Sequence, residues 1–99
     1  MDKKQTYAVV TGATSGIGLE FARLFAADGV HLVLVARSKQ ELNNIARELG
    51  DAYAVDVRVL PLDLSKMDRV YELPAYTKAE NLHVSYLINN AGFGDYGNF

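Results

Sequence analysis

The stretch TGATSGIG (Thr11–Gly18) lies between an apolar run and a helical pattern. Three of its eight residues are glycine, and four of the others are small or polar. A backbone this bare at a strand-to-helix turn lets a ligand approach the main chain closely, and the N-terminus of the following helix favours negative charge. A phosphate group is therefore the ligand that this stretch predicts.

A strand, a helix and a second strand are predicted around this turn. Residues 7–10 form a short β-rich run, and His31–Ala36 (HLVLVA) is apolar almost throughout, as expected for a strand buried on both faces of a parallel sheet. The helix between them is predicted to stop at Gly29. Helical spacing assigns four large residues to its buried face: Ile17, Phe21, Leu24 and Phe25.

A second helix and an edge strand follow. Ser38 and Glu41 form a capping-box pattern for a helix that is predicted to close at Gly50. The apolar stripe of that helix consists of Leu42, Ile45, Ala46 and Leu49. Residues 55–63 (VDVRVLPLD) alternate apolar with polar and contain Pro61, which favours the outermost strand of a sheet.

The remaining pattern completes an alternating α/β fold. Ser65 and Asp68 form another capping pattern, and Pro74 predicts a kink or two short helical pieces between Ser65 and Glu80. His83–Ile88 is the fourth strand. The sequence predicts a partial Rossmann-like, doubly wound parallel sheet of four strands in the order 3-2-1-4, with three helices. The first two helices are expected on one face and the third on the other.

Composition restricts the class of protein. The chain has 99 residues, 49% of them hydrophobic, so residues 1–99 are predicted to form one soluble domain without a second one. A net charge of −2 disfavours nucleic acid and anionic membranes as partners, and no segment is apolar for long enough to span a membrane. The chain has no cysteine, which excludes disulfides and thiolate metal sites and is compatible with a cytoplasmic location. No metal site is predicted.

In a doubly wound sheet, ligands bind beyond the carboxyl ends of the strands, at the switch point between strands one and four. Gly12 would allow the tight turn, Gly16 the close approach of a pyrophosphate, and Gly18 the packing of helix on strand. The amides of residues 15–17 are expected to point at the anion. A glycine-rich turn without any ligand is the alternative reading of the same residues.

The choice of cofactor depends on the end of the second strand. A carboxylate there would bind the ribose 2′-hydroxyl of NAD, but the residues are Val35, Ala36, Arg37 and Ser38. A guanidinium matches a phosphate. The sequence therefore predicts NADP(H) rather than NAD, with Arg37 on the 2′-phosphate and Ser38 assisting. The alternative is a solvated arginine at a helix start.

Three motifs, in this order and spacing, resemble the N-terminal, cofactor-binding half of a classical short-chain dehydrogenase/reductase. They are TGATSGIG, Asp63-Leu64 after the third strand, and Asn89-Asn90-Ala91-Gly92 after the fourth. The resemblance implies that Asp63 meets the adenine amino group and that Leu64 lies against the ring. It also implies that Asn89 ties the central strands together and that residues 90–92 line the ribose of the adenosine. Residue chemistry alone leaves Asp63 equally a turn or helix-start residue.

The predicted cofactor-binding residues come from these motifs and from the end of the second strand. They are Gly12, Thr14, Ser15, Gly16, Ile17, Gly18, Arg37, Ser38, Asp63, Leu64, Asn90, Ala91 and Gly92.

No catalytic residue is predicted. Resemblance to the family implies hydride transfer between NADP(H) and a carbonyl or alcohol, carried out with a serine and a Tyr-x-x-x-Lys pair. None of the six tyrosines here has lysine four residues later. Tyr76 with Lys78 comes nearest, and we interpret it as surface; His31 and His83 are interpreted as structural. These 99 residues are therefore expected to bind cofactor without turning over a substrate.

An exposed apolar sheet edge invites self-association. We expect a homodimer or larger assembly that buries the edge of strand four or the less covered face of the sheet. Three functions compete: the cofactor-binding segment of an NADP-dependent oxidoreductase, a non-catalytic nucleotide-binding module, and a self-associating fragment with an empty site.

Overall fold

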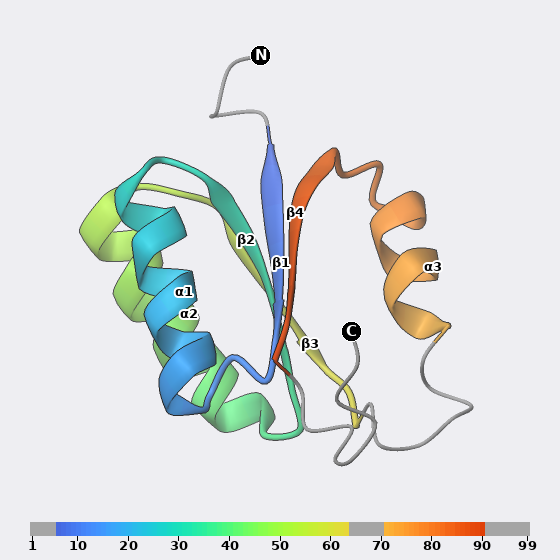
Figure 1. The fold of residues 1–99 in the computed structure, drawn as a ribbon, viewed down its shortest axis with the longest axis horizontal. Helices are drawn as coiled ribbons and strands as arrows, with labels where there is room; N and C mark the ends of the chain where they lie inside the picture. The colour runs from blue at the N-terminus through green and yellow to red at the C-terminus, as the bar shows by residue number, and fades with distance from the viewer. Residues whose placement is uncertain (1–5, 64–70, 91–99) are drawn as a thin grey trace.

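The computed structural model describes residues 6–63 and 71–90 of the chain. Strands and helices alternate along it in the order β1 (Tyr7–Thr11), α1 (Gly16–Ala27), β2 (His31–Ala36), α2 (Lys39–Tyr53), β3 (Val57–Pro61), α3 (Glu72–Ala79) and β4 (Val84–Asn89). All three strand pairings are parallel, and the sheet order is β3-β2-β1-β4 (Figure 1). The predicted α/β class and the order 3-2-1-4 are thereby confirmed.

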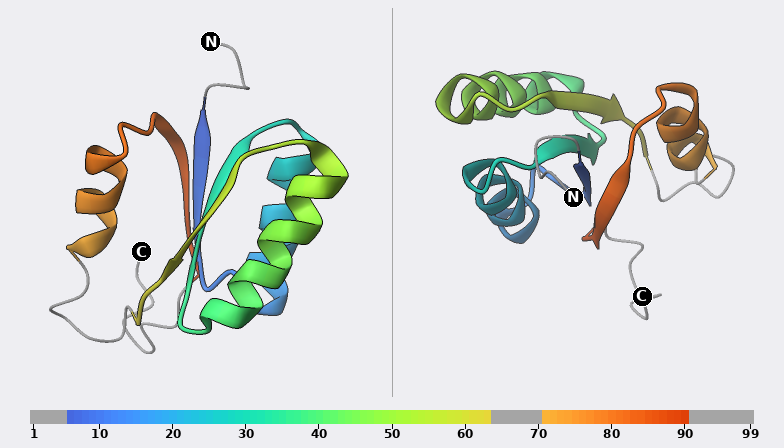
Figure 2. Two further views of the ribbon diagram at one scale, coloured as in Figure 1. Left: turned by 180° about the vertical axis from the view of Figure 1, so that it is seen from behind. Right: turned by 90° about the horizontal axis from the view of Figure 1, so that it is seen from above.

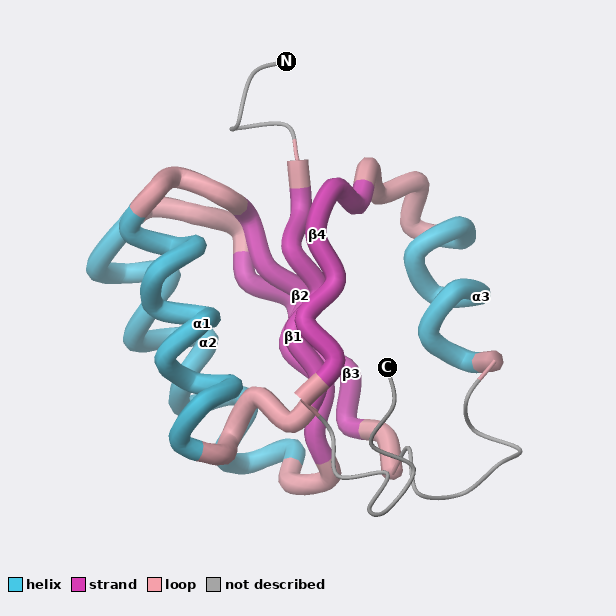
Figure 3. The backbone as a smooth tube through the Cα atoms, viewed as in Figure 1, coloured by secondary structure: helices cyan, strands magenta, loops and turns pink. Residues whose placement is uncertain are grey.

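Two layers of helix enclose the sheet. α1 and α2 lie side by side on one face, and among the described helices only α3 lies on the other (Figure 2). The tube in Figure 3 shows the same division, with the sheet between the two helical layers. The predicted placement of the helices is correct.

The core is divided unequally between the two faces of the sheet. The larger cluster lies under α1 and α2; its fully buried residues include Val10, Leu32, Leu34, Leu42 and Leu49. The smaller cluster lies under α3 and has four buried members, Val9, Val33, Val35 and Leu62. Leu73 and Tyr76 of α3 pack against it while remaining partly exposed. The interpretation of Tyr76 as a surface residue is therefore wrong.

The buried face of α1 differs from the prediction. Of the four expected core residues only Phe25 packs against the core, whereas Ile17 is 66% exposed and Leu24 is 60% exposed. The buried residues are the small ones, Gly18, Ala22 and Ala26. Because small residues let a helix approach the sheet closely, the large side chains next to them are left on its outer flank.

The ends of α2 were predicted only in part. Ser38 is the N-cap, and its hydroxyl oxygen accepts a hydrogen bond from the Glu41 amide at 3.3 Å, so the serine half of the predicted capping box is confirmed. Gly50, however, does not end the helix, which continues to Tyr53 and is capped by Ala54 in the left-handed conformation, with φ of 57°. Packing of α2 against the sheet offsets the cost of an interior glycine, about 1 kcal/mol.

The third helix and the edge strands have slightly different bounds from those predicted. Pro74 lies in the first turn of α3, where backbone amides have no hydrogen-bond partner within the helix. A proline there costs no helical hydrogen bond, so it does not interrupt the described helix. Ser65 and Asp68 lie outside the described residues. β3 is shorter than the predicted stretch 55–63, but it is the outermost strand, as expected.

A polar cluster joins β1, β3 and α3 at the amino ends of the strands. The Tyr7 hydroxyl donates a hydrogen bond to the Asp56 carboxylate. Arg58 contacts Asp56 at 2.9 Å through Nε and Glu80 at 2.7 Å through Nη1, and it lies over the Tyr7 ring. The backbone amide of Asp56 donates to Nδ1 of His31 at 2.9 Å. This cluster links α3 to the sheet.

The cluster shifts the pKa values of its members. Burial raises the pKa of Tyr7, and the Asp56 carboxylate raises it further. Burial alone would raise the pKa of Asp56, but the hydrogen bonds from Tyr7 and Arg58, together with the Arg58 charge, outweigh that effect and lower it. The Asp56 carboxylate is thus stabilised in its charged form.

Candidate functional site

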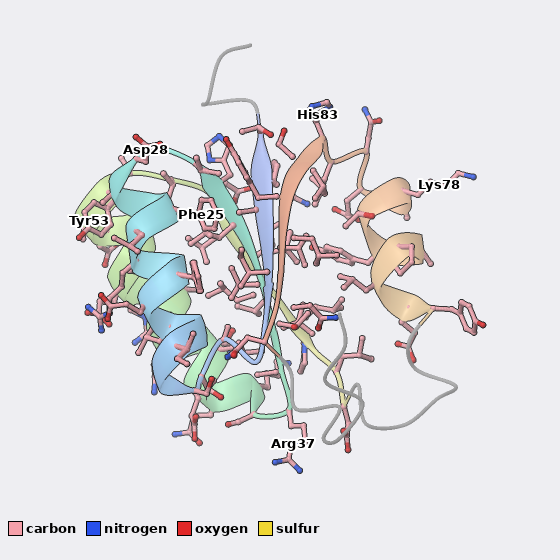
Figure 4. The ribbon with its side chains drawn as sticks, in the orientation of Figure 1. Phe25, Asp28, Arg37, Tyr53, Lys78 and His83 are labelled. Atoms are coloured by element: carbon pink, nitrogen blue, oxygen red, sulfur yellow. The ribbon has the colours of Figure 1, made fainter. Side chains whose placement is uncertain are left out.

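The predicted site residues gather at the carboxyl ends of the strands. The glycine-rich turn follows β1, Arg37 follows β2, and Asn90 follows β4. Figure 4 shows Arg37 at this end of the molecule, with Asp28 and His83 at the opposite end. β1 and β4 are neighbours in the sheet, and the helices that follow β1 and precede β4 lie on opposite faces. This is the switch point at which open α/β sheets bind their ligands.

Gly12 makes the turn after β1. Its φ of 64° lies in the left-handed region that favours glycine, as predicted for a tight turn. Its carbonyl oxygen accepts three hydrogen bonds, from the Ser15 amide at 3.1 Å, the Ser15 hydroxyl at 2.8 Å and Nδ2 of Asn90 at 3.4 Å. The negative end of this peptide dipole is therefore satisfied within the protein.

Gly18 is required by close packing. An added Cβ would lie 2.2 Å from the Gly12 carbonyl oxygen and 2.9 Å from Nδ2 of Asn90. This close contact explains why residue 18 is glycine. The sequence predicted that Gly18 packs the helix against the strand, whereas the atoms it meets belong to the turn and to the residue after β4. By contrast, a Cβ added at Gly16 would meet nothing within 4 Å.

The N-terminus of α1 is left without a side-chain cap. Ser15 is the N-cap residue and has the extended backbone typical of that position, but its hydroxyl makes no capping hydrogen bond. Instead the hydroxyl donates to the Gly12 carbonyl and lies 2.7 Å from Nδ2 of Asn90, from which it accepts. The Ser15 amide also donates to Gly12, so the amides available to an anion begin at Gly16 rather than at Ser15.

A buried threonine at the start of the glycine-rich stretch, which was not among the predicted site residues, connects the two central strands. Thr11 is 2% exposed, and its hydroxyl donates to Oδ1 of Asn89 at 3.0 Å. This contact gives Asn89 the strand-tying role that the family resemblance implied. The Ala13 amide in turn donates to the Val35 carbonyl at 3.1 Å, which ties the glycine turn to the end of β2. The signal in the sequence that could have revealed Thr11 is a polar residue at the end of a buried strand.

The remaining predicted residues lie at the start of α1 and after β2 and β3. Arg37 and Ile17 are exposed, Thr14 and Ser38 are half-buried, and Asp63 is half-buried two residues after β3. Hydrogen bonds thus bring the turn and Asn90 together. Arg37 and Asp63 lie at the carboxyl ends of β2 and β3. Leu64, Ala91 and Gly92 lie outside the described residues.

The described part of the chain contains neither a membrane-spanning helix nor a cluster of metal-ligating side chains. None of the helices within residues 6–63 and 71–90 has both the length and the apolar character needed to cross a membrane. Over the same residues, no three histidine, aspartate or glutamate side chains come together in a way that could hold a metal ion.

Comparison with known families agrees with this geometry. Residues 6–99 match the family described as short chain dehydrogenase. The chain belongs to the short-chain dehydrogenase family. Its fold and its glycine turn are therefore those of an oxidoreductase family whose members use nicotinamide dinucleotides.

Several curated members of the short-chain dehydrogenase family are similar in sequence. A very-long-chain 3-oxoacyl-CoA reductase of Meyerozyma guilliermondii is 43% identical over 91 residues, which is 91% of this chain and 26% of the relative. A fatty acyl-CoA reductase of Acinetobacter baylyi is 38% identical over 90% of this chain and 30% of the relative. The human inactive hydroxysteroid dehydrogenase-like protein 1 is 34% identical over 87% of this chain and 26% of the relative. The chain thus spans between about a quarter and a third of the length of these relatives.

Solved structures of the short-chain dehydrogenase family are equally similar. L-sorbose reductase from Gluconobacter frateurii, complexed with NADPH and L-sorbose, superposes with a TM-score of 0.81 and 36% identity over 93% of this chain and 36% of that one. A short-chain dehydrogenase from Sphingobium yanoikuyae in complex with NADPH has a TM-score of 0.80 and 39% identity over 88% of this chain and 34% of that one.

Proposed function

We propose that the carboxyl end of this sheet binds NADP(H), with the pyrophosphate at the N-terminus of α1. The observation that carries the proposal is an uncapped helix start beside a residue, Gly16, at which even a Cβ would meet no atom within 4 Å. Free first-turn amides and the positive end of the helix dipole suit a doubly charged diphosphate. The NADPH complexes of two structural relatives support the choice of ligand.

The residues present fit this cofactor. The Gly12 carbonyl, which would repel an anion, is occupied by three donors from within the protein. We propose that Thr14 and the amides of residues 16–18 contact the pyrophosphate, that Ile17 flanks it, and that Asp63 and Leu64 hold the adenine. Residues 90–92 are proposed to line the ribose of the adenosine.

Arg37 is proposed to select NADP(H) over NAD(H). It is exposed, it follows β2 directly, and no carboxylate stands at that position to bind a ribose 2′-hydroxyl. Its planar guanidinium matches a 2′-phosphate, and the nearby Ser38 is proposed to assist. A charge-assisted hydrogen bond of this kind contributes about 1.5 to 3 kcal/mol, which corresponds to a preference of one to two powers of ten.

For the whole protein we propose an oxidoreductase that transfers hydride between NADP(H) and a carbonyl or alcohol. Bound cofactor would supply the hydride; these residues would hold and orient it. Five tyrosines have a fourth following residue within the sequence, and in none of the five is it lysine, so we propose that these 99 residues by themselves do not turn over substrate. A non-catalytic nucleotide-binding module is the second candidate, favoured by the relative whose name describes it as inactive.

Titration of the 99-residue chain with NADPH and NADH, followed by cofactor fluorescence, tests the proposal. Tighter binding of NADPH is expected, and Arg37→Ala should reduce the ratio of the two affinities by roughly tenfold to a hundredfold. The matched control is Arg47→Ala, on the exposed surface of α2, which should leave the ratio unchanged. An unchanged ratio in Arg37→Ala would refute the role of Arg37, and no binding of either cofactor would refute the site.

We also propose that the chain self-associates through the outer edge of β4, beside which the described residues place no further strand. Val84, Tyr86 and Leu87 of this strand are 37%, 42% and 60% exposed. Unpaired backbone groups together with exposed apolar side chains favour the addition of a further strand.

A further inference from the structure

Ser15 and Ser38 occupy equivalent positions but make different hydrogen bonds. Both are N-cap residues with extended backbones, at φ −84°, ψ 163° and φ −89°, ψ 105°. The Ser38 hydroxyl accepts from the amide three residues later, in the usual way, whereas the Ser15 hydroxyl makes no such contact. Because the backbone of Ser15 already suits capping, only the orientation of its side chain separates the two arrangements.

Asn90 donates a hydrogen bond to the Ser15 hydroxyl, which in this orientation does not cap α1. Its Nδ2 lies 2.7 Å from the Ser15 oxygen and 3.4 Å from the Gly12 carbonyl oxygen, to which Ser15 also donates at 2.8 Å. Nδ2 carries two hydrogens and so can serve both acceptors. The three residues form a closed hydrogen-bonded triangle that connects the end of β4 to the start of α1.

We propose that Asn90 is a positioning residue that keeps Ser15 from capping α1 and thereby keeps the first-turn amides available to the cofactor pyrophosphate. The inference rests on the proposed NADP(H) site. Without Asn90, the Ser15 hydroxyl would lose a donor and would turn to the amide of Ile17 or Gly18, the usual partners of an N-cap serine. The bound anion would then have to displace an internal cap, and its affinity would fall.

The first experiment measures amide hydrogen exchange by NMR in the ligand-free 99-residue chain. In the wild type, the amides of Ile17 and Gly18 should exchange rapidly. Asn90→Ala should slow the exchange of one of them by about fivefold, the factor that corresponds to the free energy of a typical N-cap. Combining Asn90→Ala with Ser15→Ala should restore rapid exchange. Equal exchange in the wild type and in Asn90→Ala would overturn the proposal.

The second experiment measures NADPH affinity in the same variants. Asn90→Ala should weaken binding by at least about fivefold, because it frees Ser15 to cap α1 and also removes a side chain proposed to line the ribose; the added Ser15→Ala should recover about fivefold, the part due to capping. A purely structural role for Asn90 predicts no recovery, so an equally weak or weaker double variant would overturn the proposal. Asn44→Ala, on the exposed surface of α2, is the matched control and should bind like the wild type.

Ser15→Asp should also produce a capped N-terminus of α1, without altering Asn90. Aspartate is a strong N-cap and adds a negative charge where the pyrophosphate is proposed to bind, so it should protect the Ile17 or Gly18 amide and weaken NADPH binding by more than Asn90→Ala does. Undiminished binding would contradict the proposal. Failure of the wild type to bind NADPH would refute the proposed function, whereas the exchange measurement would still decide whether Asn90 controls Ser15.

Discussion

Gly18 shows how one missing methyl group organises the turn. The Gly12 carbonyl oxygen lies only 2.2 Å from the position that a Cβ on Gly18 would take. That oxygen is also the acceptor for both Ser15 donors, so displacing it would disturb the whole turn. The close approach of α1 to β1 therefore depends on this glycine.

Gly18→Ala is expected to lower the free energy of unfolding by roughly 1 to 3 kcal/mol, because the added methyl overlaps a backbone atom that cannot move freely. Urea denaturation followed by circular dichroism measures the change. Gly50→Ala is the matched control: its Cβ would lie 3.6 Å from the Val55 oxygen, an ordinary contact, and alanine should stabilise the helix by about 0.5 to 1 kcal/mol. Equal effects of the two substitutions would contradict this account.

Asp56 is expected to make the stability depend on pH. Its pKa in the folded chain is lowered, so its contribution is present above the unfolded pKa, near 3.9, and is lost as the pH falls through the lower folded value. The free energy of unfolding should therefore decrease between about pH 5 and pH 3. Denaturant titrations across this range measure it. Asp56→Asn should flatten the curve, while Asp51→Asn, on the exposed surface of α2, should not.

At the scale of elements, the two N-caps of α1 and α2 show that the same residue type serves different ends. Ser38 stabilises its own helix, whereas Ser15 is held by Asn90 and leaves its helix uncapped. The hydrogen bond that Ser15 accepts comes from a residue just after a distant strand, since Ser15 and Asn90 are 75 positions apart.

The C-terminus of α2 stores a small strain that a glycine would relieve. Ala54 has φ of 57°, in the left-handed region where an L side chain is disfavoured. Ala54→Gly should raise the free energy of unfolding by about 0.5 to 1 kcal/mol, measured by urea denaturation. Ala52→Gly, two residues earlier on the exposed surface of the helix, should instead lower it by about 1 kcal/mol. Loss of stability in Ala54→Gly would show that the αL position is not costly.

For the whole molecule, the two edges of the sheet differ. The β3 edge contains Pro61 and the ion-paired Arg58, both of which discourage further strand addition. β4 has the sequence VSYLIN, with no charge and no proline. Pairing with β1 places Leu87 on the same face as Val9, under the lone helix α3, where the sheet is covered less.

The chain is expected to sediment as a dimer or larger species at high concentration. Leu87→Lys places a charge on the exposed edge strand and should shift the equilibrium toward monomer by at least tenfold, since like charges would meet across the new contact. Asn44→Lys adds the same charge on α2 and should leave the association constant unchanged. A monodisperse wild-type monomer in sedimentation equilibrium would refute self-association.

Patterns local in the sequence predicted much of the fold. The run His31–Ala36, the Ser38 cap and the glycine turn each depend on neighbouring residues, because strand burial, capping and positive φ are set within a few positions. The strand order followed from the alternation of strands and helices together with the handedness of their connections. The position of the site at the carboxyl ends followed from that order.

Only the tertiary structure decided which face of α1 is buried and what Ser15 contacts. Periodicity ranks side chains by hydrophobicity, so it selected Ile17 and Leu24, whereas contact between Gly18 and the Gly12 carbonyl brings the small residues against the sheet. The partner of Ser15 comes from the end of β4, at a separation over which sequence spacing carries no distance information. The sequence by itself determined that a bare turn follows β1, and the packing of α1, β1 and β4 determined that its helix amides are left uncapped.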